Sequence, residues 1–156
     1  MKTGSSPAYI RYSIRRDLPE MLAIEEDSFN APWTEDDFVK HMRTRNVIGM
    51  VAEVDQRVVG YIVYALNKSH LLILNIAVAA EFRRRGIGRQ MIEKLAAKLR
   101  PTGRKSLRLH VMEPNVAAQV FFRSCGFLAV GIEDEWFETG ETAYEMRREL
   151  SEASLT

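Results

Sequence analysis

Hydrophobic and polar positions along the chain follow two periods, one typical of strands and one typical of helices. Runs dominated by Val, Ile, Leu and Tyr predict strands, and apolar residues that recur every three or four positions predict amphipathic helices. The predicted strands lie at 9–15, 47–54, 58–66, 71–79, 107–112, 127–132 and 143–150. The predicted helices lie at 17–28, at 86–99, at 115–125 and from Thr34 onward. Their order, β-α-α-β-β-β-α-β-α-β-β, predicts a mixed α/β (α+β) fold.

Two of the helix starts carry a capping signal, in which a capping residue is followed three residues later by an acid. Asp17 precedes Glu20 in this way, and Thr34 precedes Asp37. The run 71–79 is almost continuously apolar. Such a run predicts a central strand that is covered on both faces.

Length and composition narrow the class of protein. The chain has 156 residues, of which 46% are hydrophobic and 28% charged, values typical of a single globular domain. We expect that domain at residues 9–150, with loose tails at 1–8 and 151–156. The longest apolar run, 71–80, is interrupted by Asn75 and is shorter than the roughly 20 residues of a membrane helix.

Charge and cysteine content exclude further classes. The formal net charge is +1, so the total charge predicts neither nucleic-acid nor membrane binding. Cys125 is the single cysteine, which excludes an internal disulfide and a zinc site with several cysteines. Residues 1–7 are small and polar and predict no secretory signal. With the single cysteine, we expect a reducing, cytoplasmic setting.

A glycine-rich turn after the buried strand is the most informative stretch. Gly86 and Gly88 follow the arginines 83–85 and open a predicted helix. The first backbone N–H groups of a helix are unpaired, and with the helix dipole they form an anion site suited to a pyrophosphate. A dinucleotide-binding fingerprint is excluded because Met91 stands where the third glycine belongs, and no Gly-Lys-Ser/Thr of a P-loop follows. An arginine-rich solvated surface is the alternative interpretation.

Three motifs in order carry a resemblance to a known family. Residues 83–88, Arg-Arg-Arg-Gly-Ile-Gly, match the signature Gln/Arg-x-x-Gly-x-Gly/Ala, and the strand before them ends in Ile-Ala-Val at 76–78. Asn115 and the segment 121–127 follow, and this segment resembles the family's x-x-Tyr-x-x-x-Gly-Phe motif. The chain resembles the GNAT acetyltransferases over about residues 9–150. Residues 24–34, from Ile-Glu-Glu to Pro-Trp-Thr, are similar to the RimI branch, the ribosomal-protein alanine N-terminal acetyltransferases.

The resemblance implies a fold, a cosubstrate and residue roles. The implied GNAT fold is a single domain with a central mixed, mostly antiparallel sheet flanked by helices. The implied cosubstrate is acetyl-CoA, without a metal, and backbone groups of three strand residues would hold its acetyl and pantetheine parts: Ile76, Ala77 and Val78. The amides that would hold the pyrophosphate belong to Arg84, Arg85, Gly86, Ile87, Gly88 and Arg89. The Asn115 side chain would contact the cofactor, cap the following helix, or do both.

His110 is the candidate base. Leu107, Leu109 and Val111 share one face of the predicted strand, whereas Arg108 and His110 share the more polar face. A histidine with an ordinary pKa near 6.5 is a competent base at pH 7. In the RimI branch a Glu stands at this position, so its replacement by histidine leaves a second interpretation, a hydrogen bond across the sheet.

The position of the family's acidic tyrosine is occupied by Phe122, which cannot donate a proton. We expect Phe122 to pack in the core beside Phe121. Tyr144 is one conceivable substitute, and water is another. Cys125, just before a helix-ending glycine, predicts a buried apolar residue rather than a nucleophile.

The acceptor side is predicted from a second group of residues. The segment 133–138 carries four acids around two aromatic residues, which would attract a cationic N-terminus. The candidate substrate-binding residues are Trp33, Glu135, Trp136 and Phe137. A solvated hairpin tip is the alternative for this segment. Glu25, Glu26 and Asp27 would either add to the same field or act as surface helix charges.

We therefore expect an acetyl-CoA-dependent N-acetyltransferase that acts on the N-terminal amine of a protein or peptide, with a ribosomal protein as one candidate acceptor. A GNAT enzyme for a small amine or a lysine side chain is the first alternative. A non-catalytic acyl-CoA-binding module is the second alternative. It is suggested by the absence of the family's tyrosine at position 122.

Overall fold

The computed structural model describes residues 7–133 and 140–150. Within these ranges the chain forms, in order, β1 (Tyr9–Tyr12), η1 (Arg15–Asp17), α1 (Leu18–Ser28), α2 (Glu35–Arg43), β2 (Val47–Val54), β3 (Arg57–Leu66), β4 (His70–Val78), η2 (Ala80–Phe82), α3 (Ile87–Ala96), β5 (Ser106–Met112), α4 (Val116–Ser124), β6 (Leu128–Glu133) and β7 (Ala143–Glu149). The order of strands and α-helices is the one that the hydrophobic periods predict. None of the helices in these ranges has the length and apolar character needed to cross a membrane.

The strands pair in the order β1-β2-β3-β4-β5-β7-β6. β4 and β5 run parallel, whereas the β1–β2, β2–β3, β5–β7 and β6–β7 pairs are antiparallel. The predicted mixed, mostly antiparallel sheet is confirmed. Two compact units share this sheet: the first comprises the described residues up to Leu66 with Asn75–Lys94, and the second comprises Asn67–Leu74 with the described residues from Leu95 onward.

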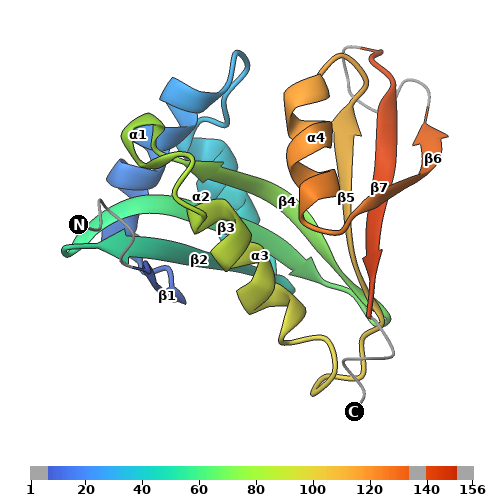
Figure 1. Cartoon of the computed structure of the whole chain (residues 1–156). Helices are drawn as coiled ribbons and strands as arrows, with labels where there is room; N and C mark the ends of the chain where they lie inside the picture. The colour runs from blue at the N-terminus through green and yellow to red at the C-terminus, as the bar shows by residue number, and fades with distance from the viewer. Residues whose placement is uncertain (1–6, 134–139, 151–156) are drawn as a thin grey trace, which may run out of the picture. The chain divides into compact units, whose positions relative to one another are not determined.

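The first unit contains the β2–β3 hairpin with α1, α2 and most of α3 (Figure 1). Asp55 and Gln56 at the hairpin turn have φ angles of 51° and 65°, which a type I′ turn requires at both central residues. Phe38 of α2 meets the ring of Tyr61 edge-on, at 5.6 Å between centroids. The neighbouring Gly60 lies close to Met91 of α3 instead. Because adjacent strand residues point to opposite faces, α2 and α3 cover opposite faces of β3.

The two predicted capping boxes have different outcomes. At α2 the box is confirmed, because Thr34 Oγ1 accepts from the Asp37 amide at 3.1 Å and Asp37 Oδ2 accepts from the Thr34 amide at 2.8 Å. At α1 the predicted box of Asp17 with Glu20 is wrong. The buried Asp17 carboxylate accepts from the Arg11 guanidinium and the Ile14 amide, and Glu20 accepts from the Val58 amide at 3.2 Å. Contacts with β1 and the residue before η1 for Asp17, and with β3 for Glu20, thus replace the predicted pair.

The second unit contains β5, β6, β7 and α4 with the first part of β4. Leu107, Leu109 and Val111 of β5 are buried, while Arg108 and His110 on the other face are half-buried, as their alternation predicts. α4 lies beside the end of β5 (Figure 1), where Gln119 Nε2 donates to the Met112 carbonyl at 3.2 Å. The more polar face of β5 carries the candidate base, His110.

Candidate functional site

The loop between η2 and α3 is held in an unusual backbone conformation. Arg84 and Gly86 have φ angles of 63° and 80°, in the left-handed region that disfavours side chains. A Cβ at Gly86 would meet no atom within 4 Å, so the backbone angle, and not a lack of space, requires glycine here. The Gly86 carbonyl accepts from the Gln90 amide at 2.9 Å and begins α3. The first-turn amides of Ile87 and Gly88 therefore have no acceptor within the helix.

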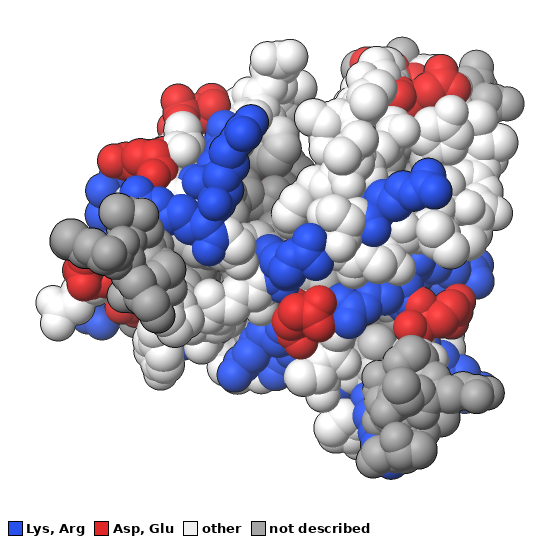
Figure 2. Space-filling view, viewed as in Figure 1, with Lys and Arg blue, Asp and Glu red and all other residues white. Residues whose placement is uncertain are grey.

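The three arginines of this loop have different roles. Arg83 donates to the Val78 carbonyl at 2.9 Å and to Ser28 Oγ at 3.0 Å, which ties the loop to the end of β4 and to α1. The Arg85 guanidinium lies over the Phe82 ring, 4.9 Å from its centroid. Arg84 is exposed. Lys and Arg side chains line this segment on the face shown in Figure 2. The loop thus combines backbone donors with positive charge, which suits an anionic ligand.

The strand residues predicted to contact the cofactor lie at the end of β4, next to this loop. Ala77 is buried, and Ile76 and Val78 are half-buried. The Arg83 bond to Val78 joins the strand end directly to the glycine turn. The contacts of these residues with a cofactor stay a prediction.

Asn115 caps α4, because its Oδ1 accepts from the Ala118 amide at 3.1 Å. The capping interpretation is confirmed, and the contact with a cofactor stays a prediction. Phe122 is buried in α4, with its ring edge-on to Phe121 at 5.2 Å and to Phe127 at 5.6 Å. The Cys125 side chain is buried. Both side chains pack as the sequence predicts.

Tyr144 does not lie beside the candidate base. It is directly opposite Val111 in the β5–β7 register, so it lies on the face of the sheet away from His110. Its hydroxyl donates to Glu113 Oε2 at 3.4 Å. The structure therefore gives Tyr144 a partner on the opposite face from the imidazole.

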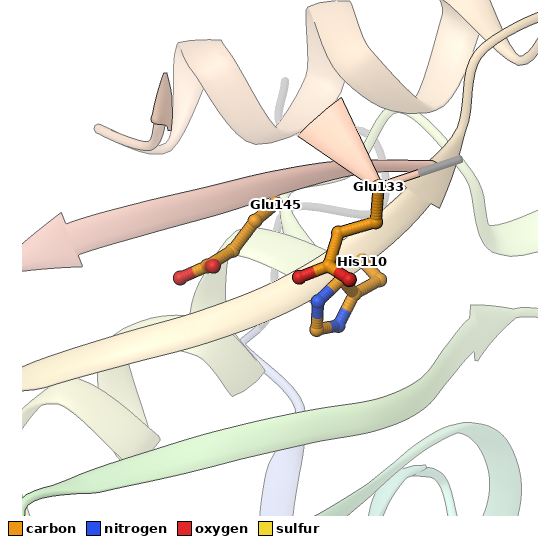
Figure 3. Close-up of side chains that lie close together, drawn as sticks. All are labelled: His110, Glu133 and Glu145. Atoms are coloured by element: carbon orange, nitrogen blue, oxygen red, sulfur yellow. The ribbon is translucent and has the colours of Figure 1, made fainter. Parts of the chain in front are cut away.

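His110 lies in a cluster with Glu133 and Glu145, contributed by β5, β6 and β7 (Figure 3). The nearest nitrogen and carboxylate oxygens of the three side chains all lie within 4.8 Å of one another. Burial lowers the pKa of His110, and the charges of Glu145 and Glu133 act in the opposite direction. An imidazole whose pKa lies below 6.5 is mostly neutral at pH 7 and can accept a proton.

This cluster can support general base catalysis. A neutral imidazole becomes positively charged when it takes a proton, and the two carboxylates beside it stabilise that charge. The same three side chains also carry nitrogen and oxygen ligands of the types that bind divalent metals, although the sequence predicts no metal for this chain. Neither Glu133 nor Glu145 was predicted as a partner of His110, since the pairing depends on the register of three strands.

The predicted acceptor residues are only partly described. Trp33 is half-buried and stacks on His41, with ring centroids 4.1 Å apart and planes 7° from parallel. Its ring also meets Phe38 edge-on at 5.1 Å. Glu135, Trp136 and Phe137 lie outside the described residues.

The sequence did not predict that Glu25 is the centre of a buried hydrogen-bond cluster. Its interpretation as a surface helix charge is wrong. Its side chain is buried, whereas Glu26 and Asp27 are exposed. It accepts hydrogen bonds from Tyr61, Asn75 and the Trp33 amide. The spacing contained a signal for this burial, because Met21, Ile24 and Glu25 stand at i, i+3 and i+4 on one helix face.

Comparison with known proteins agrees with these features. The family model described as Acetyltransferase (GNAT) family matches residues 18–127. The [ribosomal protein bS18]-alanine N-acetyltransferase of Salmonella typhimurium is 30% identical over 125 residues, which cover 80% of this chain and 84% of the relative. The crystal structure of the ribosomal-protein-S18-alanine N-acetyltransferase from Escherichia coli has a TM-score of 0.81 and 25% identity, covering 92% of this chain and 94% of that one.

A further solved structure shares the fold alone. It is described as a streptothricin acetyltransferase from Bacillus anthracis in complex with acetyl coenzyme A, and its TM-score is 0.76 at 20% identity. It covers 94% of this chain and 100% of its own.

Proposed function

This chain belongs to the GNAT family of acetyltransferases, and from that premise we propose that it transfers the acetyl group of acetyl-CoA directly to the N-terminal α-amine of a protein or peptide. The observation that carries the proposal is the glycine turn at the start of α3, whose first-turn amides and arginines suit a diphosphate. The proposed class of acceptor rests on the relative from Salmonella typhimurium, a [ribosomal protein bS18]-alanine N-acetyltransferase that is 30% identical.

Residues of the first unit would bind the cosubstrate. The amides of Arg84–Arg89 would hold the diphosphate, and backbone groups of Ile76, Ala77 and Val78 would align the acetyl-bearing arm. In the second unit, the Asn115 side chain would add a contact. The bound cosubstrate supplies a thioester, whose carbonyl carbon accepts the new bond to nitrogen while the bond to sulfur breaks.

His110 would take the proton from the attacking amine. An N-terminal α-amine has a pKa near 8, so it loses its proton more readily at neutral pH than a lysine, whose pKa is near 10.4. Burial keeps the His110 imidazole neutral, and Glu145 and Glu133 stabilise its protonated form. The same carboxylates would attract a cationic amine. Phe122 has no proton to give, so the CoA thiolate takes its proton from water or from another group.

The remaining parts of the proposal concern the partner and its setting. A ribosomal protein is the candidate acceptor, because the named relative modifies the alanine of bS18. Residues 9–150 would carry the activity, in the cytoplasm, with Trp33 on the acceptor side together with Glu135, Trp136 and Phe137.

The test combines a binding and a turnover measurement on the purified chain. Calorimetry with CoA and acetyl-CoA measures binding, and release of free CoA thiol measures transfer to peptides that begin with alanine, to polyamines and to aminoglycosides. Turnover with peptides alone supports the proposal. Turnover restricted to small amines favours the first alternative. Binding without turnover favours the non-catalytic module, which the absence of the tyrosine at Phe122 suggests. Absence of heat with either nucleotide would refute all three.

A further inference from the structure

The carboxylate of Glu25 is the centre of a buried hydrogen-bond cluster in the first unit. Its Oε1 accepts from the Tyr61 hydroxyl and from Asn75 Nδ2, the latter at 2.7 Å, and its Oε2 accepts from the Trp33 amide at 2.8 Å. The residue is only 2% exposed. A buried carboxylate is costly unless donors surround it, and here three donors meet its two oxygens.

The three donors are arranged for a carboxylate. Burial, followed by the hydrogen bond to Glu25, raises the pKa of Tyr61, so the hydroxyl keeps the proton that it donates. A glutamine at position 25 has one oxygen and one NH₂ group. In one orientation its NH₂ group would face the Trp33 amide, which cannot accept. In the other it would face Tyr61 and Asn75, which would both have to change from donors to acceptors.

These bonds join four elements through one side chain. Glu25 belongs to α1, Tyr61 to β3 and Asn75 to β4, and Trp33 lies in the segment before α2. Asn75 directly precedes Ile76, the first of the strand residues proposed to hold the cosubstrate. The rings of Trp33, Phe38 and Tyr61 continue the connection, each edge-on to the next. The cluster is therefore a closed ring of contacts that runs from Glu25 through Tyr61, Phe38 and Trp33 back to Glu25.

From this arrangement we propose that Glu25 is a positioning residue, which holds the Trp33 segment in place for the acceptor. The inference rests on the proposed function, because Trp33 is one of the proposed acceptor contacts. Glu25 itself touches no reacting atom. Its loss would release the Trp33 amide and loosen the indole from the stack on His41, so the acceptor would bind less tightly while the glycine turn stays unchanged.

The test compares Glu25→Gln with a matched control, Asp17→Asn. Asp17 is also 2% exposed and also accepts from a backbone amide and from side-chain donors of the first unit. Its donors are Arg11 and Ile14, so the control changes a buried carboxylate to its amide without touching Trp33. Two readouts separate positioning from plain destabilisation: the split between peptide KM and kcat, and the exposure of Trp33.

The exposure of Trp33 is measured without any reaction. The chain has two tryptophans, so Trp136→Phe leaves Trp33 as the one tryptophan, whose fluorescence is excited selectively and quenched with acrylamide. The KM measurements use chains that retain Trp136. In Glu25→Gln we expect the quenching constant to rise and peptide KM to increase about tenfold, the size expected when one buried donor loses its acceptor. In the same variant we expect kcat to change less than KM and the Kd for acetyl-CoA to stay unchanged. In Asp17→Asn we expect the quenching constant and the peptide KM to stay near those of the unaltered chain.

The outcomes separate the two proposals. Equal quenching in Glu25→Gln and Asp17→Asn would overturn the positioning role, and so would a fall in kcat with unchanged KM. If the unaltered chain turns over no peptide while the quenching difference remains, the proposed acceptor is wrong and the hold of Glu25 on Trp33 is supported.

Discussion

His110 of β5 and Glu145 of β7 are directly opposite each other in the register of the two antiparallel strands. Opposite residues of a strand pair project to the same face, and the two side chains lie in one cluster with Glu133 (Figure 3). The charge of Glu145 acts against the burial that lowers the pKa of His110. A single cross-strand pair thus links the candidate base to the group that adjusts its proton affinity.

Removal of the imidazole tests the base directly. In His110→Ala we expect kcat to fall by about 10²–10⁴-fold, the range that general base catalysis contributes, with little change in the Kd for acetyl-CoA. His70→Ala is the control, because His70 is a second half-buried histidine of the same unit, paired with Ser106. Steady-state thiol release and calorimetry measure the two quantities. Equal kcat in His110→Ala and the unaltered enzyme would remove His110 from the mechanism.

The pH dependence of kcat/KM tests the coupling with Glu145. His110 acts when it is unprotonated, so the acidic limb of the kcat/KM profile should rise with pH through a pKa below 6.5. Glu145→Gln removes a charge that raises this pKa, so the acidic limb should move to lower pH. Glu133→Gln should move it in the same direction by less. Glu149→Gln, on the same strand but opposite Ser106, should leave the limb in place. A limb that moves to higher pH in Glu145→Gln would contradict the coupling.

Two glycines with similar backbone angles allow the effect of backbone strain on stability to be separated from the effect of the glycine turn on CoA binding. Gly86 and Gly103 have φ angles of 80° and 73°, and a Cβ at either would meet no atom within 4 Å. Alanine at either position should therefore cost a similar amount of stability, about 1–2 kcal/mol, measured by thermal unfolding. CoA affinity, measured by calorimetry, should weaken in Gly86→Ala alone. A similar loss of affinity in Gly103→Ala would show that general destabilisation, and not the glycine turn, is responsible.

Restoration of the family's tyrosine at position 122 tests whether the lack of a proton donor to the CoA thiolate limits turnover. In Phe122→Tyr we expect a severalfold higher kcat, because the new hydroxyl could protonate the departing thiolate. Burial of that hydroxyl should cost about 1–3 kcal/mol of stability if it finds no partner. Phe127→Tyr is the control, since Phe127 is buried and packs against Phe122. An unchanged kcat in Phe122→Tyr would mean that thiolate protonation does not limit turnover.

Features that depend on neighbours along the chain could be read from the sequence. The period of apolar residues predicts the order of strands and helices, and the capping box of Thr34 with Asp37 forms as expected because its partners are three residues apart. The faces of β5 follow from alternation alone, which puts His110 on the more polar side. The glycine turn likewise predicts the start of α3, and it carries most of the family resemblance.

Other features depend on which distant segments meet, and only the tertiary structure decided them. Asp17 does not form the predicted box with Glu20, because its carboxylate accepts from the Arg11 guanidinium and from the Ile14 amide. Glu25 is buried among donors from β3, β4 and the segment before α2, and the carboxylates beside His110 come from β6 and β7. Periodicity tells which face a residue occupies, but the register between strands tells what it meets there. The register of β5 with β7 joins two strands that are not consecutive in the chain, so it depends on how both bury their apolar faces in the sheet.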